Sequence, residues 1–366
     1  MRPARIGATE VLRRPGRFAI TAAVLALLVA LQVVLWGLLD GLTGSTTGAY
    51  RALGADLLVY GPASRAALLR SQVSPELRAR VEAADGVAAV GGLGVTLTWG
   101  RTDGAPVPTD LAVFGYERST GRLPAPPPPG DGLADRSLSQ EGVAIGDVLA
   151  VGPQGVPIRV SGWVQDASYL GQPGLWVAPA TWRRVLATAA PDRVLPEGTW
   201  QALVVDAEGD AAAVAARIAR ATGAEALPLD EAISRLPGVE AQRASFLQLI
   251  GATTLVAGLV VALFFALITL ERVRLFGVLK AVGVSSAQLL GALALQALTV
   301  TGAAYAVGVA AAVALARVAP EEVPIRLTGG RVLWVAPVLV GTALLGLATS
   351  LRRVVRIDPA TAVVGR

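Results

Sequence analysis

The sequence of 366 residues contains no cysteine and no histidine. The chain therefore forms no disulfide bond, and it lacks the thiolate and imidazole ligands on which ordinary zinc sites depend. Lysine is almost missing as well, because Lys280 stands alone against 31 arginines. These absences exclude nucleophile–base pairs built on cysteine or histidine.

Charge is missing from four long stretches, which cover residues 18–39, 244–270, 281–316 and 332–351. A helix needs ~20 mostly apolar residues to cross the ~30 Å hydrocarbon core of a bilayer. Each stretch therefore predicts a membrane span, in agreement with a mean hydropathy of +0.57. The first stretch is longer than the roughly 7–15 apolar residues of a signal peptide core, so we expect it to be an uncleaved anchor.

The basic residues lie mainly at the ends of the predicted spans. Segments 1–17, 271–280 and 352–366 hold 12 basic and 3 acidic residues, a net charge of +9, whereas 41–243 has 17 against 21, or −4. Lysine and arginine on one side of a membrane are the positive-inside pattern. The pattern predicts cytoplasmic termini and disfavours nucleic acid as the reason for a pI of about 10.2.

The predicted fold is an α+β membrane protein with four transmembrane helices, one plus three. A large extracytoplasmic mixed α/β domain is inserted between the first and the second helix. The expected segments are a cytoplasmic interfacial segment 1–17, helix 18–40, the domain 41–243, helix 244–270, a cytoplasmic loop 271–287, helix 288–316, an extracytoplasmic loop 317–331, helix 332–351 and a cytoplasmic tail 352–366.

The domain at 41–243 alternates strand-like and helix-like segments. Ser74 followed by Pro75 and Glu76 predicts the start of a helix, because serine caps a helix, proline suits its first position and an acid favours its positive end. A polar helix is expected from Asp230 through Gln242, continuing into the second span. Strands are predicted at 56–60, 93–99, 110–115, 143–151, 156–164, 200–205 and 225–229, a second helix at 211–222, and a surface linker at the proline run 124–129.

Two further absences bear on function. The four long apolar stretches at 18–39, 244–270, 281–316 and 332–351 contain no charged side chain, whereas ion-coupled transporters use such groups inside the membrane. The P-loop pattern Gly-x-x-x-x-Gly-Lys-Ser/Thr is missing too, because the only lysine stands in Gly-Val-Leu-Lys-Ala at 277–281. We therefore expect no ATP hydrolysis by this chain and no self-contained secondary transport.

The segment 271–285 follows the second span. Four of its apolar residues recur at the i, i+3, i+4, i+7 spacing of an amphipathic helix; they are Leu275, Val278, Leu279 and Val282. Gly283 is placed to end this helix and Ser285 to cap the next one. On these grounds alone the segment is a cytoplasmic turn with one solvated face.

This segment resembles the cytoplasmic loop E-R-x-x-E-I-G-V-L-K-A-[IV]-G-A-S of FtsX/MacB-like ABC transporter permeases, with Leu275 in place of the second acid. Weaker similarities to the same family are the Gly-Ala-Asp-Leu at 54–57, the Ile-Gly-Asp-Val at 145–148 and the Ile-Asp-Pro-Ala-Thr-Ala at 357–362. The one-plus-three layout extends the resemblance over the whole chain. Within the family, the start of the outer domain is most similar to the DevC-like branch.

The resemblance implies a multi-pass permease subunit of a bacterial inner membrane that is not itself an enzyme and holds no cofactor. ATP and Mg would be bound by a partner, a cytoplasmic ABC ATPase. A second permease chain, membrane lipid and an adaptor or other extracytoplasmic protein are the remaining partner classes. The residues implied to contact the ATPase are Glu271, Arg272, Leu275, Phe276, Gly277, Val278, Leu279, Lys280 and Gly283. The alternative is a membrane sensor or scaffold whose outer domain binds a ligand without ATP-driven work.

Overall fold

The computed structural model describes residues 15–102, 108–119, 121–271, 278, 282, 284–320 and 323–341. The chain divides into two compact units. Residues 42–242 form one unit, called here the α/β domain. The other unit, called the helical unit, combines residues up to 41 with those from 243 onward.

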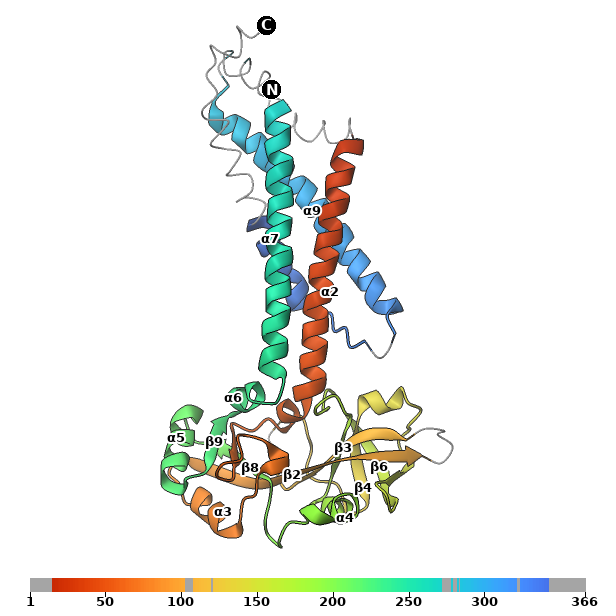
Figure 1. Ribbon diagram of the computed structural model, residues 1–366, viewed down its shortest axis with the longest axis vertical. Coiled ribbons are helices and arrows are strands. Elements are labelled where there is room, and N and C mark those ends of the chain that lie inside the picture. The colour runs from red at the N-terminus through yellow and green to blue at the C-terminus, as the bar shows by residue number, and fades with distance from the viewer. Residues whose placement is uncertain are drawn as a thin grey trace. The chain divides into compact units, whose positions relative to one another are not determined.

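The α/β domain is built on a nine-stranded sheet (Figure 1). Its strands are β1 (Leu57–Tyr60), β2 (Val87–Thr102), β3 (Thr109–Tyr116), β4 (Asp131–Asp135), β5 (Val148–Val151), β6 (Val156–Val164), β7 (Gly174–Val177), β8 (Ala202–Ala207) and β9 (Glu225–Pro228). Their order is β3-β7-β4-β6-β5-β2-β8-β1-β9, and an additional β2–β3 pairing closes six of them into a ring. The predicted mixed α/β character of this part of the chain is confirmed.

The long strand β2 belongs to both parts of the sheet. Its first half pairs with β8, its middle with β3 and its last residues with β5. Glycine is needed in this strand because a Cβ on Gly92 or Gly94 would lie 2.1 Å from the ring atoms of Trp200 or Trp182. The two indoles stack with their centroids 5.5 Å apart. They can pack against the strand because Gly92 and Gly94 have no side chains.

Four α-helices accompany the sheet: α3 (Pro75–Glu82), α4 (Pro179–Ala189), α5 (Ala211–Thr222) and α6 (Leu229–Ser234). Ser74 caps α3 as predicted, since its Oγ accepts a hydrogen bond from the Leu77 amide at 3.3 Å. Asp210 caps α5 in the same way, and Gly223 ends it with φ +72°. The bounds of α5 agree with the sequence prediction because both of its ends carry a strong local signal.

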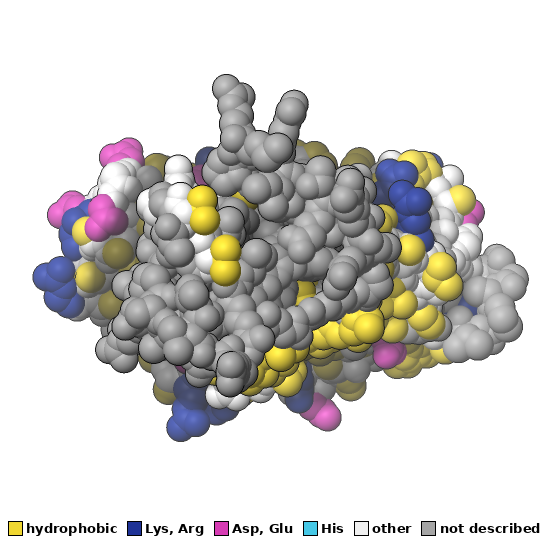
Figure 2. All heavy atoms as spheres, turned by 90° about the horizontal axis from the view of Figure 1, so that it is seen from above, with side chains coloured by type: hydrophobic (Ala, Val, Ile, Leu, Met, Phe, Trp, Pro, Cys, Tyr) yellow, Lys and Arg dark blue, Asp and Glu magenta, His cyan; other side chains and the backbone are white. Residues whose placement is uncertain are grey.

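Charged side chains of both signs lie at the edges of the face seen in Figure 2, among the residues drawn in colour. The mixture agrees with the near balance of basic and acidic residues in 41–243. The apolar core of the α/β domain consists of two clusters. One contains Trp182 and Trp200, and the other contains Tyr50, Tyr60, Phe114 and Trp176.

Three long helices, α2 (Pro15–Leu53), α7 (Val239–Glu271) and α9 (Ser286–Val318), supply the predicted spans. Their segments Ala19–Leu53, Val239–Phe264 and Ala294–Val318 are long and apolar enough to cross a membrane. A shorter apolar helix covers Gly329–Gly341. Three predicted parts lie outside the described residues: the rest of the fourth span, residues 1–14 of the interfacial segment 1–17, and the tail 352–366. The four-span topology therefore stays a prediction.

The helix that carries the first predicted span, 18–40, continues beyond it as α2 to Leu53. The bounds predicted for a second helix are wrong. The polar helix expected from Asp230 to Gln242 is divided into α6 and the start of α7. Pro237 lacks an amide donor and disfavours helical geometry in the residue before it, and Gly238 has φ +83°. The Pro-Gly pair thus interrupts the polar helix that the sequence predicted.

Candidate functional site

The predicted ATPase-contacting segment begins where α7 ends, at Glu271. Val278 is helical and 51% exposed, and Val282 lies in a turn and is 79% exposed. Ser285 caps α9 as predicted, in a capping box with Gln288. The other predicted contact residues, Arg272, Leu275, Phe276, Gly277, Leu279, Lys280 and Gly283, lie outside the described residues, so their role stays a prediction.

Polar contacts join the apolar helices of the helical unit. Gln32 on α2 donates to the Thr254 hydroxyl on α7 at 2.5 Å, and Tyr305 on α9 donates to the Val332 carbonyl at 2.6 Å. Tyr305 packs against a buried apolar cluster of α2, α9 and the Gly329–Gly341 helix, which consists of Val29, Val33, Ala312, Val335 and Leu339. A hydrogen-bonded polar side chain is tolerated in an apolar interior because its partner replaces water.

The segment after α9 lies on α2. An ideal Cβ on Gly41 would be 1.4 Å from the Pro324 carbonyl oxygen, so only glycine allows this approach. Arg331 donates to both carboxylate oxygens of Asp40 at 3.1 and 3.2 Å, and its guanidinium lies 4.5 Å from the centre of the Trp36 ring. A loop therefore covers α2 at Gly41.

The last turns of α2 are held by the loop 166–171 inside the α/β domain. The Ala49 amide donates to the Ser168 carbonyl at 2.8 Å, and the Leu170 and Gly171 amides donate to the carbonyls of Thr46 and Ser45. An ideal Cβ on Gly48 would lie 2.5 Å from the Asp166 carbonyl oxygen. The loop thus bonds to the backbone of α2 at a place where glycine exposes that backbone.

Buried Asp135 shapes the same loop. One of its carboxylate oxygens accepts from the Ala167 amide at 2.6 Å and from the Ser168 hydroxyl at 3.1 Å, and the other accepts from Ser137. A buried carboxylate is stable when several donors replace its water shell. Asp135 therefore fixes the loop conformation that contacts α2.

Three tyrosines fill the space beside the end of α2. Tyr50 and Tyr60 share a hydrogen bond of 3.2 Å between their hydroxyls, and Tyr169 stacks on Tyr50 with ring centres 5.7 Å apart. Burial raises the pKa of Tyr50 and Tyr60 well above the ordinary value, and raises the pKa of Tyr169 to about 12. The three phenols therefore stay neutral at physiological pH and act as packing groups.

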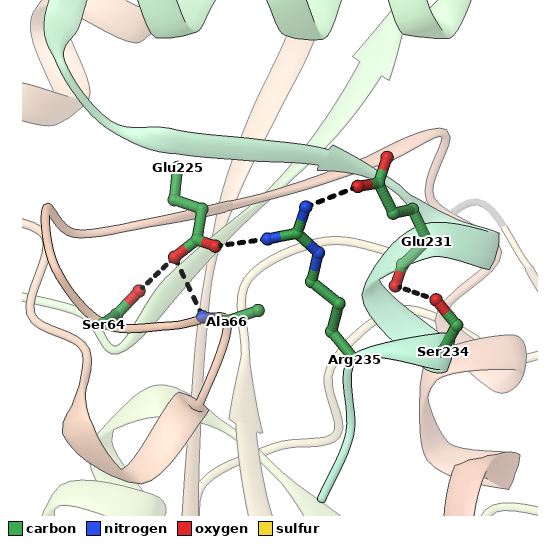
Figure 3. Close-up of polar contacts among 6 residues, drawn as sticks. All are labelled: Ser64, Ala66, Glu225, Glu231, Ser234 and Arg235. Atoms are coloured by element: carbon green, nitrogen blue, oxygen red, sulfur yellow. Dashed lines mark hydrogen bonds and ion pairs between the residues drawn. The ribbon is translucent and has the colours of Figure 1, made fainter. Parts of the chain in front are cut away.

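The start of α7 is held by charged groups (Figure 3). Arg235, which follows α6, donates to Glu225 at 3.0 Å and to Glu231 at 2.7 Å. Glu225 also accepts from the Ser64 hydroxyl at 3.1 Å and from the Ala66 amide at 2.9 Å. One carboxylate on β9 thus joins the segment before α7 to the loop 61–71.

This loop has an unusual backbone. Ala63, Arg65 and Ala66 all have φ between 53° and 59°, a left-handed conformation that costs ~1–3 kcal/mol for each residue other than glycine. Such a conformation persists only where neighbouring contacts determine it, and Glu225 supplies two of these contacts. No sequence signal pointed to Glu225, because its partners are remote in the chain.

Comparison with known proteins gives a family match for the C-terminal part. The profile of the family described as FtsX-like permease C-terminal matches residues 248–359. A protein of Mycobacterium tuberculosis strain H37Rv, named as an uncharacterized ABC transporter permease, is 38% identical over 111 residues, which are 30% of this chain and 31% of the relative. The match thus spans about a third of the length of this relative.

Two solved structures are similar to the α/β part. The extracellular domain of the noncanonic ABC-type transporter YknZ from Gram-positive bacteria is 15% identical with a TM-score of 0.32, over 46% of this chain and 92% of that one. The periplasmic region of MacB from Actinobacillus actinomycetemcomitans is 13% identical with a TM-score of 0.34, over 50% and 92%. Residues 248–359 match the FtsX-like permease C-terminal family, so the resemblance to FtsX-like permeases is confirmed for this part of the chain.

Proposed function

We propose that this chain is the permease subunit of an ABC transporter that transmits ATP-driven motion from a cytoplasmic ATPase to its α/β domain. The work done would be export or remodelling of the cell envelope. The observation that carries the proposal is the FtsX-like domain at 248–359, which includes the segment 271–285.

The helices support a transmitting role. α2 and α7 each run unbroken from residues of the helical unit into residues of the α/β domain. An α-helix keeps its backbone hydrogen bonds within itself, so it resists bending between its ends. A displacement of the cytoplasmic end of either helix would therefore be passed along its length.

The partners follow from the same proposal. A cytoplasmic ABC ATPase would bind ATP and Mg and would dock on the segment 271–285. A second copy of the permease would complete the assembly, and an adaptor or other extracytoplasmic protein would receive the motion. The cell membrane of a bacterium, with both termini in the cytoplasm, is the proposed location.

The experiment that tests this function is a pull-down of the full chain in mild detergent, with ATP hydrolysis measured on the eluate. We expect an ABC ATPase to co-purify and to hydrolyse ATP, and we expect no hydrolysis by the permease freed of it, since its sequence has no P-loop. Stable binding of a small ligand without any ATPase would favour the sensor instead. Hydrolysis by the permease alone would contradict the proposal.

The proposed topology predicts opposite accessibility of two engineered thiols. The natural chain has no cysteine, so each single variant reports one site. A thiol at Ala212→Cys, on the exposed face of α5, should react with an impermeant reagent in spheroplasts, and one at Val282→Cys should react only after lysis. The reverse labelling pattern would invert the topology.

A further inference from the structure

The junction between α6 and α7 is a closed turn. The Val239 amide donates to the Leu236 carbonyl at 3.2 Å, and the Gln242 amide donates to the Gly238 carbonyl at 2.9 Å. Leu236 and Val239, on either side of the turn, are only 2% and 6% exposed and belong to the core cluster that contains Tyr50. The first turn of α7 is therefore packed into the α/β domain.

Apolar packing alone leaves the direction of a helix weakly defined, because hydrophobic contact is not directional. A guanidinium is planar and holds its partners in fixed directions. In Figure 3, Arg235 lies between Glu225 and Glu231, with one terminal nitrogen bonded to each. The orientation of the segment that enters α7 is thus set by charged hydrogen bonds.

The other oxygen of Glu225 is committed to the loop 61–71. It accepts from Ser64 and from the Ala66 amide, beside the left-handed residues of that loop. The Gly61 amide at the start of the loop is fixed separately by the Ser71 hydroxyl at 2.9 Å. A force on Arg235 would therefore reach both β9 and a loop whose conformation depends on Glu225.

We infer that Arg235 is the positioning residue that joins the first turn of α7 to β9 and the loop 61–71, so that they move as one body. The inference rests on the proposed function, because it assigns a residue to the step in which motion enters the α/β domain. The Arg235 side chain is 48% exposed, and those of its partners Glu231 and Glu225 are 46% and 22% exposed. Ion pairs of a side chain as exposed as Arg235 contribute little to folding stability, so the role can be tested without unfolding the domain.

The test uses spin labels at two exposed positions of the α/β domain, Ala212→Cys on α5 and Glu240→Cys in the first turn of α7. The full chain is placed in nanodiscs with its co-purified ATPase, and the distance distribution between labels is measured without nucleotide and with ATP and vanadate. Arg235→Ala removes the hydrogen bonds to Glu225 and Glu231. Arg235→Lys keeps the positive charge but lacks the planar guanidinium that bonds to both carboxylates at once. Arg220→Ala is the matched control, because within the described part of the chain Arg220 bonds only to a carbonyl of its own helix.

We expect one narrow distance that nucleotide leaves unchanged in the parent and in Arg220→Ala. In Arg235→Ala the narrow distance should be lost and the mean should shift on ATP binding, with Arg235→Lys in between, while thermal unfolding stays near that of the parent. A narrow, unchanged distance in Arg235→Ala would overturn the inference.

A third label position distinguishes failure of the proposed function from failure of the role inferred for Arg235. A pair at Ala212→Cys and Val282→Cys, in the otherwise unchanged chain, reports whether nucleotide moves the proposed cytoplasmic end at all. A shift in this pair supports the proposed function, whatever Arg235→Ala does. No shift in any pair would overturn the proposed function, and the transmission role of Arg235 with it.

Discussion

Replacement of Phe276 by alanine is expected to weaken ATPase binding roughly thirtyfold, about 2 kcal/mol, because a buried aromatic anchor usually dominates such an interface. Phe276 would enter a groove on the ATPase together with three apolar residues of the 271–285 segment, Leu275, Val278 and Leu279. The measurement is the amount of ATPase that co-purifies per permease, at equal permease level in the membrane.

Lys280→Ala is the matched control for this prediction. A charge at the rim of an interface stays hydrated and affects association rate more than affinity, so its loss should reduce the co-purified ATPase only slightly. If Phe276 instead anchors the segment in the lipid interface, Phe276→Ala should leave ATPase binding unchanged. Equal, parental ratios in both variants would show that the segment is not the docking site.

Gly48→Ala is expected to destabilise the α/β domain by roughly 1–3 kcal/mol, the usual cost of forcing extra atoms into a packed site. The added methyl group would lie 2.5 Å from the Asp166 carbonyl oxygen. The loop 166–171 cannot retreat without losing its backbone hydrogen bonds to α2. For a domain of this size the melting temperature should fall by roughly 2–4 °C for each kcal/mol.

The same substitution at Gly251 is the control, because a Cβ there meets none of the described residues within 4 Å. Alanine favours a helix over glycine by ~0.5–1 kcal/mol, so Gly251→Ala should leave the melting temperature unchanged or raise it. Thermal unfolding of the full purified chain, followed by near-ultraviolet circular dichroism, compares the two. A Gly48→Ala protein as stable as the parent would show that the loop does not hold α2.

The resemblance at 271–285 was accessible from sequence because it is local. Its charged residues, its amphipathic spacing and its ending at Ser285 stand within fifteen consecutive residues. The family match at 248–359 and the capping box at Ser285 agree with that interpretation. Short-range signals of this kind need no knowledge of which segments meet in space.

Predictions of strands and helices were correct where a local signal marks the ends of the element. They were wrong where the ends depend on contacts with other strands. α5 was predicted within its observed bounds because Asp210 and Gly223 mark its ends. β2 was predicted at 93–99 but covers Val87–Thr102, because its outer residues are strand only through pairing with β8 and β5. Strand length is decided by partners, and the sequence of one strand does not name them.

What the sequence by itself determined is the class of the molecule. Uncharged stretches of span length, basic segments at their ends, the missing P-loop and the motif at 271–285 all follow from residue type and spacing, because a bilayer and a helix impose fixed lengths and periods. These features led to the resemblance to FtsX/MacB-like permeases, which the family match supports for residues 248–359.

Only the tertiary structure decided how the α/β domain holds its helices. Glu225 meets Ser64 across 161 positions of the chain and meets Arg235 across 10, and the loop 166–171 reaches the backbone of α2 from more than a hundred residues away. Such contacts depend on the closing of the sheet, which brings remote segments together. The strength of these hydrogen bonds depends on the distances and angles between donor and acceptor. No local pattern in the sequence predicts those distances and angles.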